Sequence, residues 1–420
     1  MATEPDLAKF NPFDPETMQC PFPEYAKMRA DAPVLHVESL NMFLVTRHDL
    51  VGEVARDATT FAQFRGSSMP LPSDDLARLA AAQREGYPRV PTMFNADPPA
   101  HTRYRRLVSK AFTVKAINDL EPAVRAITTT LIDAWIDMGH IEFVGQFAAP
   151  LPMEVIAKAL GVPDDRLADF KRWSDDTVVG FGANPPLDVM IEAAHGVNDF
   201  QRYFAAELEQ RRDHPQDDLL TRLVEARIDD DDPDVVDKRP LDIPEMLSLI
   251  LQMLVGGNET TTKLLAEMMR LLGEHPEHWD AVRQDPAAIP GIVEETLRLS
   301  SPGQAMFRTA TRDVDLGGVR IPEGGRVVIV FASANRDEQL FVEPDEFDPK
   351  RANIGDHVAF GKGTHYCLGA NLTRLEVRVA LEELARRIAS FSLSDSNDYA
   401  YNPSFMLRGL IKLDLDIAAS

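Results

Sequence analysis

The chain has 420 residues, of which 44 are Lys or Arg and 67 are Asp or Glu, so its formal net charge at pH 7 is −23. This acidic balance argues against a nucleic-acid backbone as the partner. Two cysteines, Cys20 and Cys367, are too few for a disulfide framework, and the first residues show no signal-peptide pattern, so we expect a cytoplasmic protein without a membrane anchor.

No Gly/Ser-rich linker divides the chain, which predicts a single domain over residues 1–420. Close to the amino terminus, the segments PVLHVES and MFLVTR, within residues 33–47, predict a β-hairpin. The segment DPPAHTRYRRLVSKAF, residues 97–112, predicts a helix with His101 and Arg105 on one face, because they are four residues apart. Taken alone, this segment is an ordinary basic helix start.

Helical patterns cover most of residues 116–300. Within them the acidic run DDDDPDVVD, residues 229–237, predicts a solvated turn. It is followed by the longest predicted helix, residues 242–272, whose Asp242 and Glu245 have the spacing of a capping box. The apolar stretch of this helix is too short and too interrupted to span a bilayer, so we expect a core helix.

Two adjacent glycines, Gly256 and Gly257, interrupt this long helix. Together they cost on the order of 2 kcal/mol relative to alanines, which requires a reason. A close helix crossing and a functional kink are equally good explanations from the glycines alone. Glu259 and Thr260 follow directly, and an acid beside a hydroxyl can relay protons because the hydroxyl both donates and accepts.

Two weaker patterns follow the long helix. In EETLR, residues 294–298, Glu295 and Arg298 lie on one helix face, and such a pair is by default a solvated salt bridge. The segment DVDLGGVRIPEGGRVVIVF then predicts two strands around Gly317 and Gly318.

The most informative segment is FGKGTHYCLG, which ends just before a long helical pattern. Its glycines allow positive φ and close approach to a flat partner, and the amides at a helix start favour the thiolate form of Cys367, which binds metals. His365 supplies a donor that can meet a carboxylate. The competing interpretation is a buried structural thiol, which is the usual state of a single intracellular cysteine.

This segment resembles the heme-binding loop of the cytochrome P450 family, in which Phe, Gly, Cys and Gly stand where this chain has Phe360, Gly363, Cys367 and Gly369. Other family features occur in the family's order along the chain. VGGNETTT, residues 255–262, resembles the oxygen-binding groove, with Gly256 where the family more often has alanine. Glu295, Arg298 and Arg351 match the buried Glu–Arg–Arg cluster that braces the cysteine loop, and the helix with His101 matches the one beside the heme propionates.

The resemblance implies a mainly α fold with a minor β region, in which a long central helix lies over the heme and small sheets lie at the periphery. It implies heme b (iron protoporphyrin IX) as cofactor, with Cys367 as the metal ligand. Glu259 and Thr260 would be the catalytic residues. The residues expected at the cofactor are His101, Arg105, Arg308, His357, Phe360, His365, Cys367 and Gly369.

The implied function is that of a monooxygenase, which inserts one atom of dioxygen into a lipophilic small organic substrate by hydroxylation. Electrons would come from NAD(P)H through ferredoxin and ferredoxin reductase, since the chain has no strand-linked GxGxxG motif of its own. Two alternatives are a peroxide-driven peroxygenase of the same fold and a non-enzymatic heme-thiolate sensor. The acid and alcohol pair argues against the first, and the intact oxygen-groove motif against the second.

The resemblance also suggests partner surfaces. Arg103, Arg106, Lys110 and Lys362 would form a basic patch for an acidic ferredoxin on a monomeric protein. The pocket would be apolar and rich in methionine, which suits a lipophilic substrate but leaves terpenoid, steroid, fatty acid and aromatic compounds equally possible. Its expected lining comprises residues 178–186, Met253, Leu254, Gln304, Met306, Phe307, Phe405 and Met406, with core packing as the alternative role of each.

Overall fold

The computed structural model describes residues 6–63, 73–179 and 185–420, and these residues form two compact units. Unit 1 comprises Met1–Phe64, Thr128–Pro150 and Thr260–Ser420, and unit 2 comprises Arg65–Ile127 and Leu151–Glu259. Each unit is formed by several separate stretches of the chain. The long helix Ile243–Glu274 has residues in both units. The single domain expected from the sequence stays a prediction.

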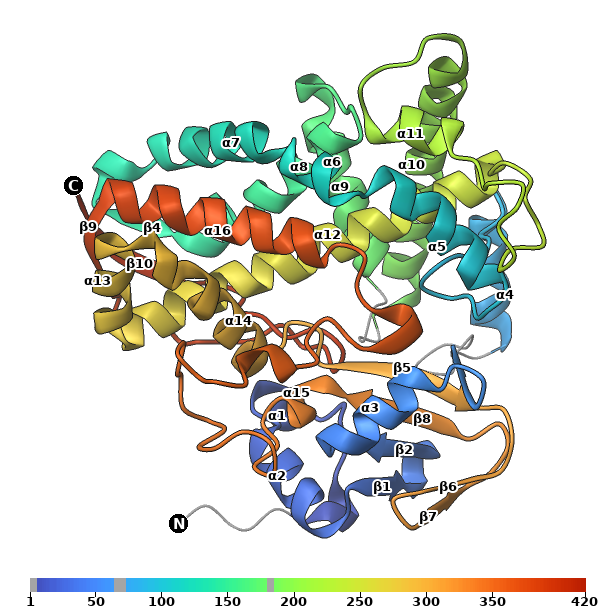
Figure 1. Cartoon of the computed structure of the whole chain (residues 1–420), viewed down its shortest axis with the longest axis horizontal. Helices are drawn as coiled ribbons and strands as arrows, with labels where there is room; N and C mark the ends of the chain where they lie inside the picture. Colours follow the sequence, from blue (N-terminus) through green and yellow to red (C-terminus); the bar gives the residue numbers. More distant parts are fainter. Residues whose placement is uncertain (1–5, 64–72, 180–184) are drawn as a thin grey trace. The chain divides into compact units, whose positions relative to one another are not determined.

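Helices dominate the described residues, as the sequence predicts (Figure 1). The α-helices are α1 (Pro15–Gln19), α2 (Phe22–Asp31), α3 (His48–Arg56), α4 (Ser73–Gln83), α5 (Ala100–Ala111), α6 (Val114–Asn118), α7 (Glu121–Asp133), α8 (Pro150–Ala159), α9 (Leu167–Val178), α10 (Leu187–Asp213), α11 (Leu219–Glu225), α12 (Ile243–Glu274), α13 (Pro276–Gln284), α14 (Ile289–Ser300), α15 (Phe331–Ala334) and α16 (Ala370–Arg387). The strands are β1 (Val34–Val37), β2 (Met42–Val45), β3 (Phe61–Gln63), β4 (His140–Glu142), β5 (Ala305–Ala310), β6 (Val314–Leu316), β7 (Val319–Ile321), β8 (Arg326–Val330), β9 (Ile388–Leu393) and β10 (Asp414–Ala419).

Unit 1 contains a mixed five-stranded sheet in the order β1-β2-β8-β5-β3. The hairpin predicted near the amino terminus is present, with Val34 opposite Val45. Strand β8 pairs in parallel with β2, which brings blue and orange segments of the chain side by side in Figure 1. A buried apolar cluster that includes Phe43, Val327 and Ile329 packs on this sheet, so hydrophobic burial holds distant segments together.

The other sheets of unit 1 are smaller. Strands β6 and β7 form a hairpin whose turn is Gly317 and Gly318, with φ values of 54° and 82°. Such positive values at both turn positions suit a tight hairpin and favour glycine. The sequence predicts two strands in this segment, and the structure adds a third, β8, directly after them. A three-stranded sheet in the order β4-β10-β9 joins residues near 140 to the carboxyl terminus.

Helix α12 begins with the predicted capping box. The amide of Glu245 donates to Asp242 Oδ1 over 2.9 Å, and the amide of Asp242 donates to Glu245 Oε2 over 3.0 Å. These two bonds satisfy amides that a helix start otherwise leaves open, which explains why the helix begins here. None of the helices formed by described residues is long and apolar enough to cross a membrane.

Unit 2 consists of helices packed around buried aromatic side chains. Phe170 and Trp173 of α9 contact Phe204 of α10, with ring centroids 6.3 and 6.4 Å apart. Helix α5 is fixed to the first turn of α12 in the same unit, because Arg103 and Tyr104 both donate to Glu245, over 3.0 and 2.9 Å. The start of α12 therefore positions α5.

Candidate functional site

Cys367 lies in the loop between a short 3₁₀ turn, Gly363–His365, and the start of α16. Its amide donates to the carbonyl of Phe360 over 2.9 Å, which closes the loop on itself. Gly369 occupies the N-cap of α16, and a Cβ added there would lie 3.9 Å from the Cys367 sulfur. The thiol is only partly buried and is not in a disulfide. This arrangement supports the metal-ligand interpretation, because a structural thiol is normally fully buried.

The glycines of the loop have distinct physical reasons. Gly361 and Gly363 adopt φ values of 70° and 69°, a region that side chains disfavour. A Cβ on Gly363 would also come within 2.8 Å of the carbonyl oxygen of Ala55, at the end of α3. The loop therefore packs directly against α3, and any side chain at residue 363 would displace it.

The predicted brace behind this loop is present and buried. Glu295 receives two bonds from Arg298, over 2.7 and 2.8 Å, and one from Arg351 over 3.2 Å. Both residues of the Glu295–Arg298 pair are fully buried. The remaining guanidinium donors bond backbone carbonyls of residues 335–346. A buried ion pair with its hydrogen bonds satisfied fixes the path of the chain that leads to the cysteine loop.

A second cluster of charges, which sequence reasoning missed, lies beside the brace. Glu294 accepts two bonds from Arg374, over 2.6 and 2.8 Å, and one from His357 over 3.0 Å. The guanidinium of Arg374 lies 4.6 Å from the ring centroid of Phe360. These contacts join α14 and α16 to the first residue of the cysteine loop. Although partial burial opposes ionisation, the hydrogen bonds from Arg374 and His357 prevail and lower the pKa of Glu294 to about 2.

The same geometry bears on the heme contact expected for His357. Its Nδ1 accepts from the amide of Ala359 over 3.2 Å, so its Nε2 carries the proton that is donated to Glu294. Both ring nitrogens are therefore used by protein groups, which argues against a propionate contact. No local sequence pattern could predict the contact of His357 with Glu294, because the two residues are 63 positions apart.

Helix α12 continues unbroken through Gly256 and Gly257. In the described part of the chain, a Cβ on Gly256 would meet no atom within 4 Å, and one on Gly257 would only touch Ile156, at 4.0 Å. Close packing against the described atoms therefore does not require these glycines, and their functional role stays a prediction. Glu259 and Thr260 follow in the next turn, and both are partly buried.

Thr261, the residue after the predicted catalytic threonine, links two elements of unit 1. Its hydroxyl lies 3.5 Å from that of Thr373 on α16, and both residues are buried. Thr373 in turn donates its amide to the carbonyl of Gly369, over 2.9 Å. A chain of contacts thus joins the helix of Thr260 to the helix that starts at the cysteine loop.

Helix α5 places His101 and Arg105 one turn apart, as predicted. Burial, and then the positive charge of Arg105, lower the pKa of His101, so its ring is neutral at pH 7 and can donate one hydrogen bond. The predicted surface role of Arg103 is wrong. This residue is 4% exposed, and its guanidinium is held by Glu245 and by backbone carbonyls.

The other two α5 cations of the predicted basic patch, Arg106 and Lys110, are exposed. Both are paired with carboxylates of residues 229–237, which we call the acidic segment. The segment forms turns and is mostly exposed, as predicted, but three of its carboxylates also pair with cations of α5. Lys362, the fourth predicted cation, belongs to unit 1.

Arg308 and His365 are the remaining residues expected at the propionates, and both belong to unit 1. Arg308 lies on β5 and is 6% exposed. Its guanidinium donates to the side-chain oxygen of Gln63 and to the carbonyl of Phe307. A buried guanidinium close to the sheet suits an anionic group of a ligand.

Several residues expected to line a substrate pocket meet in unit 1. The ring centroids of Phe307 and Phe405 are 6.3 Å apart, and the amide of Gln304 donates to the carbonyl of Met406 over 2.8 Å. Met306 instead packs on the apolar cluster of the sheet, where a strand places it on the face opposite Phe307.

The two remaining lining residues of the described chain, Met253 and Leu254, are buried in unit 2. The predicted contribution of residues 178–186 falls largely outside the described residues.

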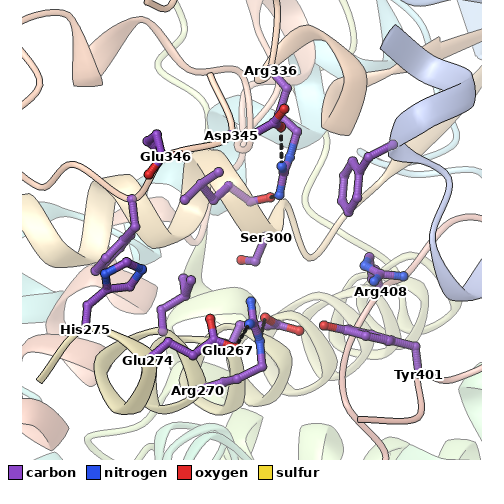
Figure 2. A pocket seen from close by; sticks show the side chains of 14 residues that line it. Glu267, Arg270, Glu274, His275, Ser300, Arg336, Asp345, Glu346, Tyr401 and Arg408 are labelled. Atoms are coloured by element: carbon purple, nitrogen blue, oxygen red, sulfur yellow. Dashed lines mark hydrogen bonds and ion pairs between the residues drawn. The ribbon is translucent and has the colours of Figure 1, made fainter. Parts of the chain in front are cut away.

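Unit 1 also contains a polar cavity of about 230 Å³ (Figure 2). Arg270 enters it beside Glu267, and Arg336 enters from the opposite wall, 2.5 Å from Asp345. Arg408 and Tyr401 form a third side. Among the described residues, none that we predicted for the cofactor, for oxygen or for the substrate lines this cavity. Its charged walls suit ordered water, so we do not assign the substrate to it.

Comparison with known proteins agrees with these features. A model described as "Cytochrome P450" matches residues 187–410. Erythromycin C-12 hydroxylase of Saccharopolyspora erythraea is 38% identical over 376 residues, which cover 88% of this chain and 88% of that protein. Steroid C26-monooxygenase of Mycobacterium tuberculosis is 36% identical over 340 residues, covering 80% of this chain and 88% of that protein.

Solved structures give the same result. The structure of cytochrome P450 CYP109Q5 from Chondromyces apiculatus matches with a TM-score of 0.84 and 34% identity, over 99% of this chain and 100% of that one. This similarity confirms the predicted fold class, which is mainly α with small sheets.

Proposed function

Since this chain belongs to the cytochrome P450 family and is a monooxygenase of that family, we propose that it hydroxylates a lipophilic small organic molecule with one atom of dioxygen. The observation that carries the proposal is the loop around Cys367. Cys367 is only partly buried, its amide donates to the carbonyl of Phe360, and Gly369 places no side chain beside its sulfur.

The family uses a heme-thiolate cofactor, and we propose that this chain binds heme b, whose iron Cys367 would hold. Iron held by a thiolate supplies oxygen activation, because electron donation from sulfur favours cleavage of the O–O bond. The donor set of the chain fits this group: one sulfur on a glycine-rich loop, with Phe360 fixed beside it by Arg374. We assign propionate contacts to Arg308, His365, His101 and Arg105.

Glu259 and Thr260 have the proposed role of delivering protons. The hydroxyl of Thr260 can accept a proton from one neighbour and donate its own to another, and Glu259 is the acid that resupplies it. The open space beside Gly256 suits dioxygen and water next to these side chains. This pair also supports oxygen-driven chemistry over a peroxygenase, which needs no proton relay.

Family members depend on redox partners, and we propose a ferredoxin and its NAD(P)H-dependent reductase for this chain. The sequence has no dinucleotide motif of its own, which supports electron supply by a separate reductase. Helix α5 supports docking of an acidic carrier, because it bears exposed cations and the predicted heme contacts on the same short helix. The monomeric state and the cytoplasmic location stay predictions.

The substrate proposal is based on the aromatic contact between Phe307 and Phe405, together with Met406. Apolar side chains with an adaptable methionine suit a lipophilic ligand. The relatives named for a steroid and for erythromycin support the same broad class.

The ferrous carbon monoxide spectrum tests the central assignment. We expect the thiolate form for the wild-type protein and for Cys20→Ser, since Cys20 is exposed and is the only other cysteine. Cys367→His should lose the thiolate form entirely. A wild-type spectrum of the imidazole type would refute the assignment of Cys367.

Turnover then separates the candidate functions. The proposal requires product formation with ferredoxin, reductase and NAD(P)H, and little product with hydrogen peroxide alone. The reverse pattern would indicate a peroxygenase, and binding of ligands without turnover would indicate a sensor.

A further inference from the structure

The exposed cations of α5 already have acidic partners within unit 2. The Nε of Arg106 lies 2.9 Å from Asp232, and its Nη2 lies 2.9 Å from Asp234. The ammonium of Lys110 lies 2.9 Å from Asp229. Three carboxylates therefore face two cations, so this face of α5 presents a negative charge to an approaching protein while the acidic segment stays in place.

The second half of the acidic segment is anchored by buried groups. Val235 is 3% exposed. The guanidinium of Arg103 donates to the carbonyl oxygens of Asp237, Arg239 and Pro240 over 3.1, 2.9 and 3.2 Å. These contacts fix where the segment returns to the protein, and so they hold its first half within reach of α5.

The ion pairs of Asp234 and Asp229 with α5 lie at the surface, whereas the side chain of Asp232 is only 12% exposed. The side chains of Arg106 and Lys110 are 48% and 44% exposed, and those of Asp234 and Asp229 are 64% and 72% exposed. Ion pairs with this exposure contribute little to stability, because water and salt screen them. Carboxylates from another molecule can therefore replace Asp229 and Asp234 at small cost, while displacement of Asp232 also requires a less exposed side chain to leave Arg106.

We propose that the acidic segment is an internal competitor for the acidic electron carrier on the Arg106–Lys110 face of α5. This inference rests on the proposed function, since the carrier is the ferredoxin of the monooxygenase. The carrier binds when its own carboxylates displace Asp229, Asp232 and Asp234 from the two cations. A carrier with few surface carboxylates cannot make this exchange, so the segment also selects among carriers.

A pair of matched double variants tests the competition. Asp232→Asn with Asp234→Asn removes both carboxylates that contact Arg106, and it keeps the oxygen of Asp232 that caps the amide of Asp234. Asp230→Asn with Asp231→Asn removes the same charge from the same segment, without touching an ion pair to α5 in the described chain. The difference between the Kd values of the two double variants separates direct competition from the general loss of negative charge.

The measurement is the Kd for an oxidised, acidic [2Fe–2S] ferredoxin on the heme-loaded protein, at about 0.02 M and about 0.3 M salt. At low salt we expect the Asp232/Asp234 variant to bind about threefold to tenfold more tightly than the Asp230/Asp231 variant. At high salt this difference should disappear. The double variant Arg106→Glu with Lys110→Glu should have a Kd for the ferredoxin well above that of the wild type.

Equal Kd values for the two Asn variants would overturn the proposal, as would an absence of ferredoxin binding by every variant. Neither result depends on turnover. The carbon monoxide spectrum and product formation of the same preparations report separately on the proposed function. A protein that turns over with ferredoxin, yet gives identical Kd values for the two variants, would refute only the competitor.

Discussion

A buried carboxyl group gives α16 its own pH dependence. Glu376 is 2% exposed, and its Oε2 has no hydrogen-bond partner among the described residues. Burial raises the pKa of Glu376 well above its usual value of 4.5. The folded protein therefore keeps a proton that the unfolded chain releases above about pH 4.5.

The sign of the resulting effect on stability follows directly. Above the unfolded pKa the native state binds more protons than the unfolded state, so the free energy of unfolding falls as pH rises. The loss is at most about 1.4 kcal/mol per pH unit while the folded carboxyl stays protonated. Glu376→Gln removes this proton, so its Tm should decline less than the wild-type Tm between about pH 6 and pH 8.

Thermal unfolding of the heme-loaded proteins across this pH range checks the expectation. Glu382→Gln is the control, because Glu382 lies on the same helix, is more exposed and is paired with Arg378 at 2.8 Å. Its Tm should follow the wild-type curve. If Glu376→Gln followed that curve as well, Glu376 would not be protonated in the folded protein.

At the scale of elements, the cluster of Glu294, His357 and Arg374 connects three segments of unit 1. Arg374 makes a bidentate pair with Glu294 and lies over Phe360. The amide of Cys367 donates to the carbonyl of the same Phe360. The position of the cysteine loop thus depends on both α14 and α16.

We predict that Glu294→Gln loosens the cysteine loop more than it destabilises the protein. The neutral amide loses the charge-assisted pair with Arg374, which is worth about 1.5–3 kcal/mol for hydrogen bonds to charged groups. The ferrous carbon monoxide complex should convert from the thiolate form severalfold faster on mild heating. Asp133→Asn is the control, since it removes the carboxylate partner of Arg387 at the far end of α16.

The pH dependence of this cluster has the opposite sign to that of Glu376. The pKa of Glu294 is lowered to about 2, so its stabilising effect is complete above about pH 4.5 and is lost only as pH falls toward 2. The thiolate form of the wild type should therefore not be lost through Glu294 in mild acid. Equal conversion rates for Glu294→Gln and Asp133→Asn would contradict the role of this cluster.

At the scale of elements, local sequence patterns predict the contacts between residues that are close in the chain, but not the contacts between distant segments. The capping box of α12 and the spacing of Glu295 and Arg298 involve residues three apart, and the structure confirms both. The parallel pairing of β2 with β8 and the contact of Arg374 with Glu294 join distant segments, so no local period could reveal them. The assigned roles of Glu259, Thr260 and the propionate contacts stay predictions.

The acidic segment shows a second kind of limit. A run of aspartates predicts a solvated turn when its partners are unknown, because like charges repel and prefer water. Its partners, Arg106 and Lys110, lie more than 100 residues earlier on α5. The sequence therefore predicted the exposed turn correctly, but it gave no sign of the ion pairs with α5.

On the scale of the whole molecule, the net charge of the protein and the cations of its docking face act on an acidic carrier in opposite directions. The net charge of −23 repels an acidic carrier at long range, while docking requires cations at one face. Salt screens long-range repulsion over about 10 Å at 0.1 M. Buried pairs such as Glu295 with Arg298 are screened much less, because water does not reach them.

The same net charge predicts how stability responds to salt. Repulsion among excess carboxylates destabilises the compact state, and unfolding relieves it by moving the charges apart. The Tm of the heme-loaded protein at pH 7.5 should therefore rise by a few degrees as NaCl increases from about 0.01 M to about 0.15 M. The same titration at about pH 5.5, nearer the sequence pI of about 4.8, should give a smaller rise because fewer excess charges remain. A Tm that falls with added salt at pH 7.5 would mean that the exposed ion pairs, including those of the acidic segment, contribute more to stability than the excess negative charge removes.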